Sequence, residues 1–238
     1  MKQKYRALWN SYYKNISNNL SNNILESALY NTQTSETGNL VVILKDDSVK
    51  SLASIGKYIK KIIKKVPTPL FISRKYIETS LDSYPLEFLN IYSDYEIMEQ
   101  KHSIISQLKF DKEFIRLQIE RELKGKLILI KTALLENYKN EKTLNELIKV
   151  SFSSIIPVLK GFIFLLGLDI PKDNNSVIKL SDEKTDFSIQ SFKTANEIFE
   201  GKNIKKLDIS INSFFDEYTD QLNRLSLYVD ALEINRSK

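Results

Sequence analysis

The residues best suited to chemistry gather in a polar stretch, residues 31–39, directly ahead of the five aliphatic residues Leu40–Leu44. Glu36, Thr37 and Asn39 bring a carboxylate, a hydroxyl and an amide to the start of that apolar run. If the protein carries out a reaction, the sequence predicts it at this place.

Sulfur and imidazole chemistry is almost absent from the chain. The 238 residues include no cysteine and one histidine, His102. Disulfides, thiolate zinc sites and thiol nucleophiles are therefore excluded, and a Ser-His-Asp triad would depend on His102 alone. We interpret His102 as a solvated linker residue. The net charge of +5 permits an anionic partner without requiring one.

The elements that must position the polar stretch can be predicted from its flanks. Leu40–Leu44 is a short, β-branched-rich run between polar segments, which is typical of a buried central strand. We expect one or two helices within residues 3–29, with Ile24–Tyr30 as a short strand. After the central strand, the pattern predicts a helix over residues 49–65 capped by Ser48, a strand over 70–72, a helix over 74–81 and a further strand over 85–92. The order strand–helix–strand favours a right-handed parallel crossover.

The second half of the chain changes character after about residue 100. Helical spacing predicts four long helices over residues 112–138, 143–168, 187–200 and 207–232, with at most a short helix in 169–186. Such helices with short connections are typical of a bundle. We therefore predict a helix-rich α+β protein with domains at 1–100 and 101–238. The longest apolar run, residues 155–168, is shorter than a membrane span and the N-terminus lacks a signal peptide, so we expect a cytoplasmic protein that does not enter a membrane.

Two motifs carry a resemblance to a known family. One is Tyr84-Pro85-Leu86-Glu87-Phe88-Leu89-Asn90-Ile91, which is similar to a Phe-Pro-Ile-Glu-Phe-Leu-Asp-Ile signature found in one bacterial branch of the family. The other is Arg116–Leu127, which is similar to a distinctive helix of that branch. Together with Pro67–Phe71, these stretches resemble nucleotidyltransferases of the polymerase-β type, in their small bacterial two-domain form. The resemblance implies a mixed sheet with flanking helices followed by a helical bundle.

The active-site motif of that family is where this sequence departs. The family places Gly-Ser at the end of one strand and Asp-x-Asp at the start of the next, where the carboxylates hold Mg²⁺ against a nucleotide triphosphate. Here Asn31 and Thr32 stand at the first motif, and Thr37 and Asn39 at the second. Asn90 also replaces an acid and leaves Glu87 as the carboxylate there. The comparison with the family implies a catalytically degenerate member with a binding or scaffold role that uses the cleft between the domains, and with no expected cofactor.

Two other functions stay open. An active transferase would use Mg²⁺ and a nucleotide, with Glu36, Asn39 and Glu87 as an unconventional metal site. A basic RNA- or protein-binding module would use the lysines within residues 57–65.

Further residues that could contact a ligand lie in the second half of the chain, on the predicted helix that starts at residue 112. Arg116, Gln118, Glu120 and Arg121 either line a cleft between the domains, as in related two-domain transferases, or form an exposed salt-bridged face. The partner stays open between a nucleotide, RNA and a protein. Tyr5, Trp9, Tyr12 and Tyr13 offer a contact for a homodimer.

Overall fold

The computed structural model describes residues 1–137, 140–202, 204–207 and 209–232. The chain divides into two compact units, Met1–Phe110 and Asp111–Lys238, and each is described by itself. The predicted boundary at about residue 100 differs from this division by the short segment that contains the 3₁₀ turn η1 (Ile105–Gln107).

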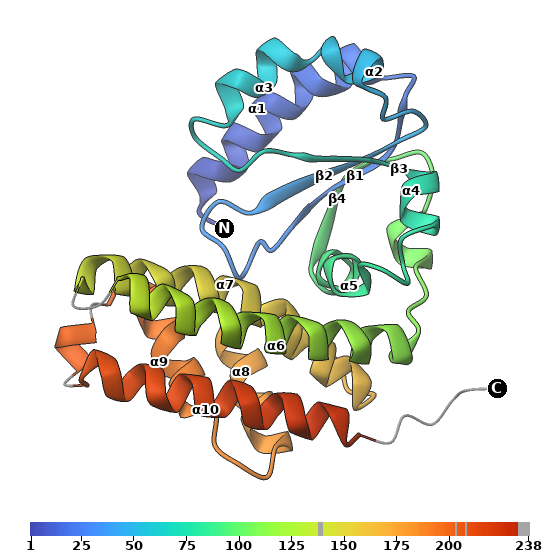
Figure 1. The fold of residues 1–238 in the computed structure, drawn as a ribbon. Helices are drawn as coiled ribbons and strands as arrows, with labels where there is room; N and C mark the ends of the chain where they lie inside the picture. Colours follow the sequence, from blue (N-terminus) through green and yellow to red (C-terminus); the bar gives the residue numbers. More distant parts are fainter. Residues whose placement is uncertain (138–139, 203, 208, 233–238) are drawn as a thin grey trace. The chain divides into compact units, whose positions relative to one another are not determined.

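The N-terminal unit is built on a four-stranded mixed sheet (Figure 1). Its strands are β1 (Ile24–Tyr30), β2 (Asn39–Leu44), β3 (Leu70–Ser73) and β4 (Tyr95–Gln100), in the order β3-β2-β1-β4. β1 runs antiparallel to β2 and to β4, whereas β2 and β3 are parallel. The predicted central strand and the parallel crossover are therefore confirmed.

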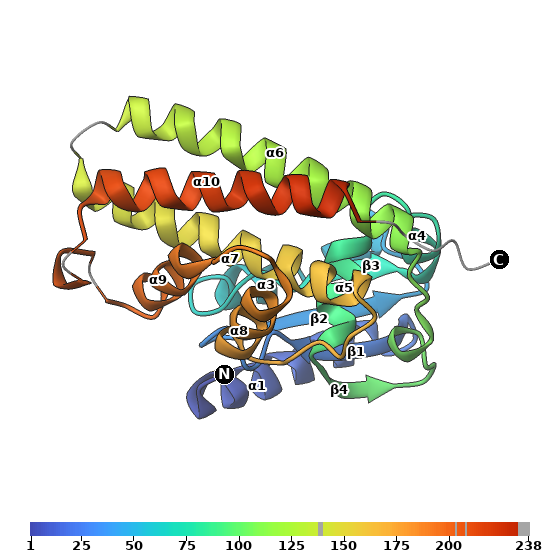
Figure 2. The ribbon, with the colours of Figure 1, turned by 90° about the horizontal axis from the view of Figure 1, so that it is seen from below.

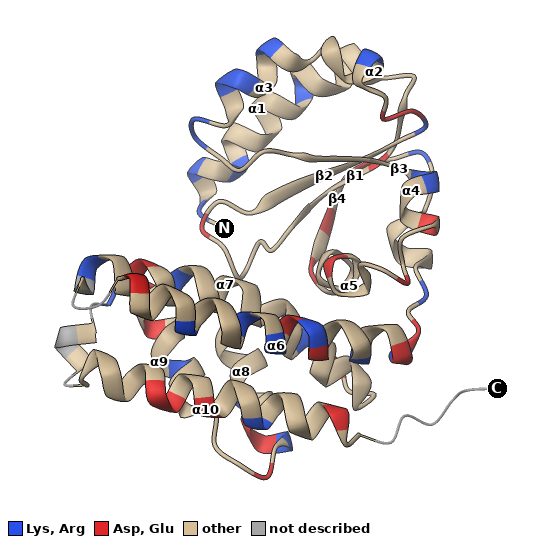
Figure 3. Ribbon diagram, in the orientation of Figure 1, with Lys and Arg blue, Asp and Glu red and all other residues tan. Residues whose placement is uncertain are grey.

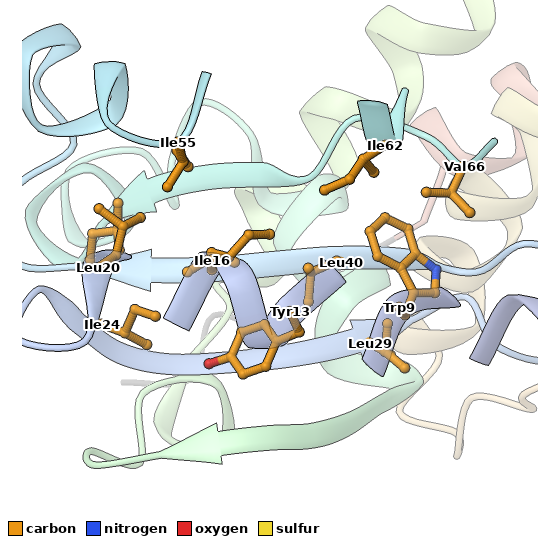
Figure 4. Packing of buried hydrophobic residues seen from close by; sticks show 12 residues of the cluster. Trp9, Tyr13, Ile16, Leu20, Ile24, Leu29, Leu40, Ile55, Ile62 and Val66 are labelled. Atoms are coloured by element: carbon orange, nitrogen blue, oxygen red, sulfur yellow. The ribbon is translucent and has the colours of Figure 1, made fainter. Parts of the chain in front are cut away.

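Helices cover both faces of this sheet. On one face lie α1 (Gln3–Leu20), α2 (Val49–Ala53) and α3 (Gly56–Ile62). Their apolar residues pack with alternate residues of β2, because successive strand residues point to opposite faces (Figure 4). The other face packs against α4 (Arg74–Glu78), α5 (Pro85–Ser93) and η1.

One predicted element of this unit is wrong, and one strand was not predicted. Residues 85–92 form the helix α5, not a strand, and residues 95–100 form the missing strand β4. Pro85 occupies the first turn of α5, where its missing N–H costs no hydrogen bond. The helix predicted over 49–65 is also interrupted, because it divides into α2 and α3 around Ser54 and Ile55.

The C-terminal unit consists of helices (Figure 2). Its described elements are α6 (Lys112–Glu136), α7 (Glu141–Leu165), α8 (Asn174–Lys184), α9 (Gln190–Phe199), the 3₁₀ turn η2 (Ile204–Leu207) and α10 (Ile211–Asp230). The described residues of this unit thus form five α-helices. Four long helices were predicted, and the fifth is α8, within residues 169–186, where at most a short helix was expected. Buried aromatic residues such as Phe152, Phe192 and Tyr218 form its core.

The helix α7 is long and apolar enough to cross a membrane by length and composition alone. The buried core helix of a folded domain meets the same criteria, and 61% of the apolar window of α7 is buried. α7 packs against α6, α8 and α9. Its apolar surface is therefore used within the helical unit.

Candidate functional site at one edge of the sheet

The polar stretch lies where three strands meet. β1 ends at Tyr30, which pairs with Asn39 at the start of β2 and with Tyr95 at the start of β4. Because β1 is antiparallel to both neighbours, its last residue shares one edge of the sheet with their first residues. The loop 31–38, between β1 and β2, therefore lies at this edge together with the residues that lead into β4.

The backbone of this loop turns through two left-handed residues. Asn31 has φ +54° and Gly38 has φ +62°. Asparagine adopts this conformation more readily than most residues that have a side chain. Asn31 thus adopts a left-handed backbone conformation, which is also accessible to the glycine of the related motif, and it adds a polar side chain. A Cβ at Gly38 would lie 3.0 Å from the Met1 sulfur, so this position is also tightly packed.

Thr32 lies between two carboxylates. Its side chain is buried, and its Oγ1 lies 3.1 Å from Glu96 Oε1 and 3.5 Å from Asp94 Oδ1. The backbone N–H of Gln33 donates to Asp94 Oδ2 at 3.4 Å. Asp94 is only 2% exposed, so these donors replace the water that a carboxylate normally requires.

The start of the chain holds the same loop from the α1 side. Arg6 Nη2 lies 2.6 Å from Glu96 Oε2, and Trp9 Nε1 donates to the carbonyl of Thr37 at 2.8 Å. Lys2 donates its backbone N–H to the Glu36 carbonyl at 2.9 Å and pairs with the Glu36 carboxylate at 2.5 Å. The hydrogen bond from Lys2 lowers the pKa of Glu36 below its usual range.

The residues proposed for an unconventional metal site lie in different surroundings. Glu36 is exposed and paired with Lys2, whereas Glu87 is exposed on α5 rather than on a strand. Thr37 Oγ1 lies 3.2 Å from Ser35 Oγ, and Asn39 is half-buried at the first position of β2. Among the described residues, no group of three or more Asp, Glu or His side chains is arranged to hold a metal ion.

Three residues of this edge were missed from the sequence: Asp94, Glu96 and Arg6. Asp94 and Glu96 were overlooked because β4 was not predicted, and their positions at the sheet edge follow from its pairing with β1. The available signal for β4 was alternation: the apolar residues Tyr95 and Ile97 are separated by the charged Glu96. Arg6 carried no signal of its own, since its role depends on how α1 packs on the sheet.

The four predicted ligand contacts on α6 do not all share one face. Arg116 Nη1 lies 3.7 Å from Glu120 Oε2 and 3.5 Å from Asp230 Oδ1 of α10. Glu120 also pairs with Lys124, and that hydrogen bond lowers the pKa of Glu120. With 3.6 residues per turn, Gln118 and Arg121 lie on other sides of the helix from this cluster. Gln118 is buried and Arg121 is exposed.

Comparison with known proteins establishes the fold. No protein-family model and no curated protein matches the chain. Among solved structures, it is similar to spectinomycin adenyltransferase AAD(9) from Enterococcus faecialis, crystallised with ATP and spectinomycin. The TM-score is 0.56 with 11% sequence identity, and the match covers 90% of this chain and 97% of that chain. This chain therefore has a helix-rich, nucleotidyltransferase-like α+β fold.

Proposed function

We propose that this protein uses a nucleotidyltransferase-like fold for binding and has lost the metal-dependent transfer reaction. The observation that carries the proposal is the β1–β2 loop. Thr37 and Asn39 stand where the family motif has its two metal-binding acids, and neither has a carboxylate. The loop still lies at the edge where β1 ends and β2 begins.

The loss of these acids matters because of how phosphoryl groups are transferred. Catalysis rests mainly on positioning and on neutralising the charge that develops on the phosphate oxygens. Metal ions held by carboxylates supply most of that neutralisation. The two carboxylates that do lie at this edge, Asp94 and Glu96, already accept hydrogen bonds from Thr32, Gln33 and Arg6. These contacts support a structural role for both acids.

A second candidate function is an active, Mg²⁺-dependent nucleotidyltransferase acting on a small molecule, a protein or RNA. One observation favours it: Asp94 and Glu96 both lie within hydrogen-bonding distance of one hydroxyl, Thr32. Mg²⁺ in nucleotide sites is commonly held by one or two carboxylates together with phosphate oxygens. If this function holds, these two residues would hold the ion, in place of Glu36 and Glu87. The ATP in the AAD(9) structure makes ATP a natural first nucleotide to test.

Isothermal titration calorimetry with ATP, GTP, CTP and UTP, each with and without Mg²⁺, separates the two functions. The binding-only proposal expects that Mg²⁺ does not increase the affinity for any nucleotide. Metal-dependent micromolar binding would overturn it and favour the transferase.

The variant Asp94→Asn together with Glu96→Gln identifies the residues responsible. If the transferase is active, this double variant should lose Mg²⁺-dependent binding. Glu87→Gln is the matched control, because Glu87 is an exposed carboxylate on α5. Its substitution should leave binding unchanged in either case.

A further inference from the structure

The positive charge of the protein is concentrated in one unit. Residues 1–110 contain 15 Lys and Arg against 10 Asp and Glu, whereas residues 111–238 contain 20 of each. The whole net charge of +5 therefore belongs to the N-terminal unit. Within it, neither residues 1–25 nor residues 48–77 contain a single acidic residue.

Three helices of these acid-free segments form one layer of the fold. They are α1, α2 and α3, which cover the same face of the sheet, and α1 packs against α3. Figure 3 shows that α1 and α3 carry Lys and Arg but no Asp or Glu. We call this surface the basic layer and define it by its exposed lysines: Lys4, Lys14, Lys50, Lys57, Lys60, Lys61, Lys64 and Lys65.

The lysines of α3 point away from the core. Ile55 and Ile62 are buried against the sheet, and Val66 continues the same apolar stripe. Lys57, Lys60 and Lys61 of α3 follow the spacing i, i+3, i+4 on the opposite side of the helix, and Lys64 continues this stripe at i+7 in the turn after Ile62. At 1.5 Å per residue this stripe is about 10 Å long. In the described part of the chain, none of these four lysines forms a salt bridge.

We infer that the basic layer is a binding surface for the phosphodiester backbone of a nucleic acid. A duplex presents one negative charge per about 1.7 Å along its axis, so closely spaced lysines can each neutralise a phosphate. The outer side of α1 adds exposed polar residues, namely Asn10, Ser11, Asn18 and Asn19. Asparagine and serine side chains are common partners of phosphate and sugar oxygens.

The same residues argue against an anionic membrane as the partner. Membrane-surface helices bury a broad apolar face in the lipid, and their binding scales with that area. The apolar faces of α1 and α3 are already packed on the sheet. The large apolar residues exposed on and beside α2 and α3 are Val49 and Ile63, which do not make a broad face.

Fluorescence anisotropy with labelled oligonucleotides of about 20 nucleotides tests this inference, with salt varied between about 50 and 200 mM. Single-stranded RNA, duplex RNA and duplex DNA form three parallel arms, and vesicles rich in phosphatidylserine form a fourth. We expect binding to at least one nucleic acid, with a log–log salt slope of about −4 or steeper. The tightest arm identifies the form that is bound.

The test variant carries Lys57→Gln, Lys60→Gln, Lys61→Gln and Lys64→Gln. Its affinity should fall at least about tenfold at 100 mM salt, and its slope should flatten by about 3. The matched control carries Lys131→Gln, Lys142→Gln, Lys172→Gln and Lys193→Gln, which removes the same charge from exposed positions in the C-terminal unit. It should bind like the wild-type protein.

Three results would overturn the inference. The first is no binding of the wild-type protein to any nucleic acid at low salt. The second is an equal loss of affinity in the test and control variants. The third is vesicle binding that is stronger than nucleic-acid binding and lost in the test variant. The wild-type salt slope does not depend on any variant, so poor folding of a variant cannot obscure the answer. The inference is also independent of nucleotide binding at the sheet edge.

Discussion

Thr32 shows how a single hydroxyl can be tied into the edge of the sheet. In the related motif this position carries a serine, and threonine keeps the hydroxyl. In the present structure that hydroxyl faces the carboxylates of Asp94 and Glu96, which belong to the protein itself. Thr32 is buried, so water could not readily take over the hydrogen bonds that its hydroxyl makes.

Replacing Thr32 with valine should therefore lower the stability of the protein. The substitution Thr32→Val keeps the shape of the side chain but removes a donor to buried or half-buried carboxylates. We expect the free energy of unfolding to fall by about 1–3 kcal/mol. Urea denaturation followed by circular dichroism measures the change.

Thr32→Ser is the control for this substitution, because serine retains the hydroxyl and loses only a methyl group. The serine variant should be more stable than the valine variant. A valine variant as stable as the wild-type protein would show that the hydroxyl contributes nothing through Asp94 and Glu96.

At the scale of elements, β4 is held in place by contacts that begin on β1. Glu26 of β1 is fully buried. Its Oε2 accepts the backbone N–H groups of Ile104 at 2.6 Å and Ile105 at 2.9 Å, and its Oε1 accepts from Gln100 Nε2 at 3.1 Å. One carboxylate thus joins β1 to the end of β4 and to the start of η1.

Glu26→Ala should consequently destabilise the N-terminal unit strongly. It leaves two buried backbone N–H groups without their acceptor, and each unsatisfied group costs about 1–3 kcal/mol. We expect a loss of about 3 kcal/mol in the free energy of unfolding, measured by urea denaturation. Glu26→Gln keeps one acceptor oxygen without the charge, so its loss should be smaller. A loss below about 1 kcal/mol for Glu26→Ala would contradict this account.

The elements also show what could be predicted from the sequence. β2 was predictable because its five aliphatic residues lie between polar segments and are buried on both faces. α5 was not, because Leu86, Phe88, Leu89 and Ile91 are all buried. So short a run, with Glu87 as its one charged residue, has too little periodicity to distinguish a helix from a strand.

β4 escaped prediction for the opposite reason. It is an edge strand with charged residues, Glu96 and Glu99, and its side chains are only partly buried. Edge strands commonly carry such charges, which weakens the apolar alternation that marks a strand. Since Asp94 and Glu96 reach the candidate site through β4, the error in this element is also the reason that both acids were missed. The β1–β2 loop was located correctly, because it follows from the two strands that were predicted.

At the scale of the whole molecule, both units bury tyrosine hydroxyls. Tyr13 is buried and Tyr30 partly buried in the N-terminal unit, and Tyr218 is buried in the C-terminal unit. Tyr13 donates to Glu99 and accepts from Ser27, while Tyr218 lies 3.0 Å from the Ser151 hydroxyl. Burial, which disfavours the charged phenolate, raises the pKa of all three and raises the pKa of Tyr30 to about 12.

These raised pKa values predict a loss of stability in alkaline solution. In the unfolded chain each tyrosine releases its proton near its ordinary pKa of about 10. The folded state keeps the proton to a higher pH, so between these two values the unfolded state binds fewer protons and the free energy of unfolding falls as the pH rises. For Tyr30 alone, the loss should reach about 1 kcal/mol at pH 11.

Urea denaturation from about pH 8 to about pH 11 measures this loss, and the variant Tyr30→Phe isolates one tyrosine from the lysines that also titrate in this range. Phenylalanine has no proton to release, so the stability of the variant should fall less steeply above about pH 10 than that of the wild-type protein. Tyrosinate absorbance of the folded protein should show the complementary effect, because Tyr30 ionises later than an exposed tyrosine. Parallel stability curves for the two proteins would mean that the Tyr30 hydroxyl reaches solvent in the folded state.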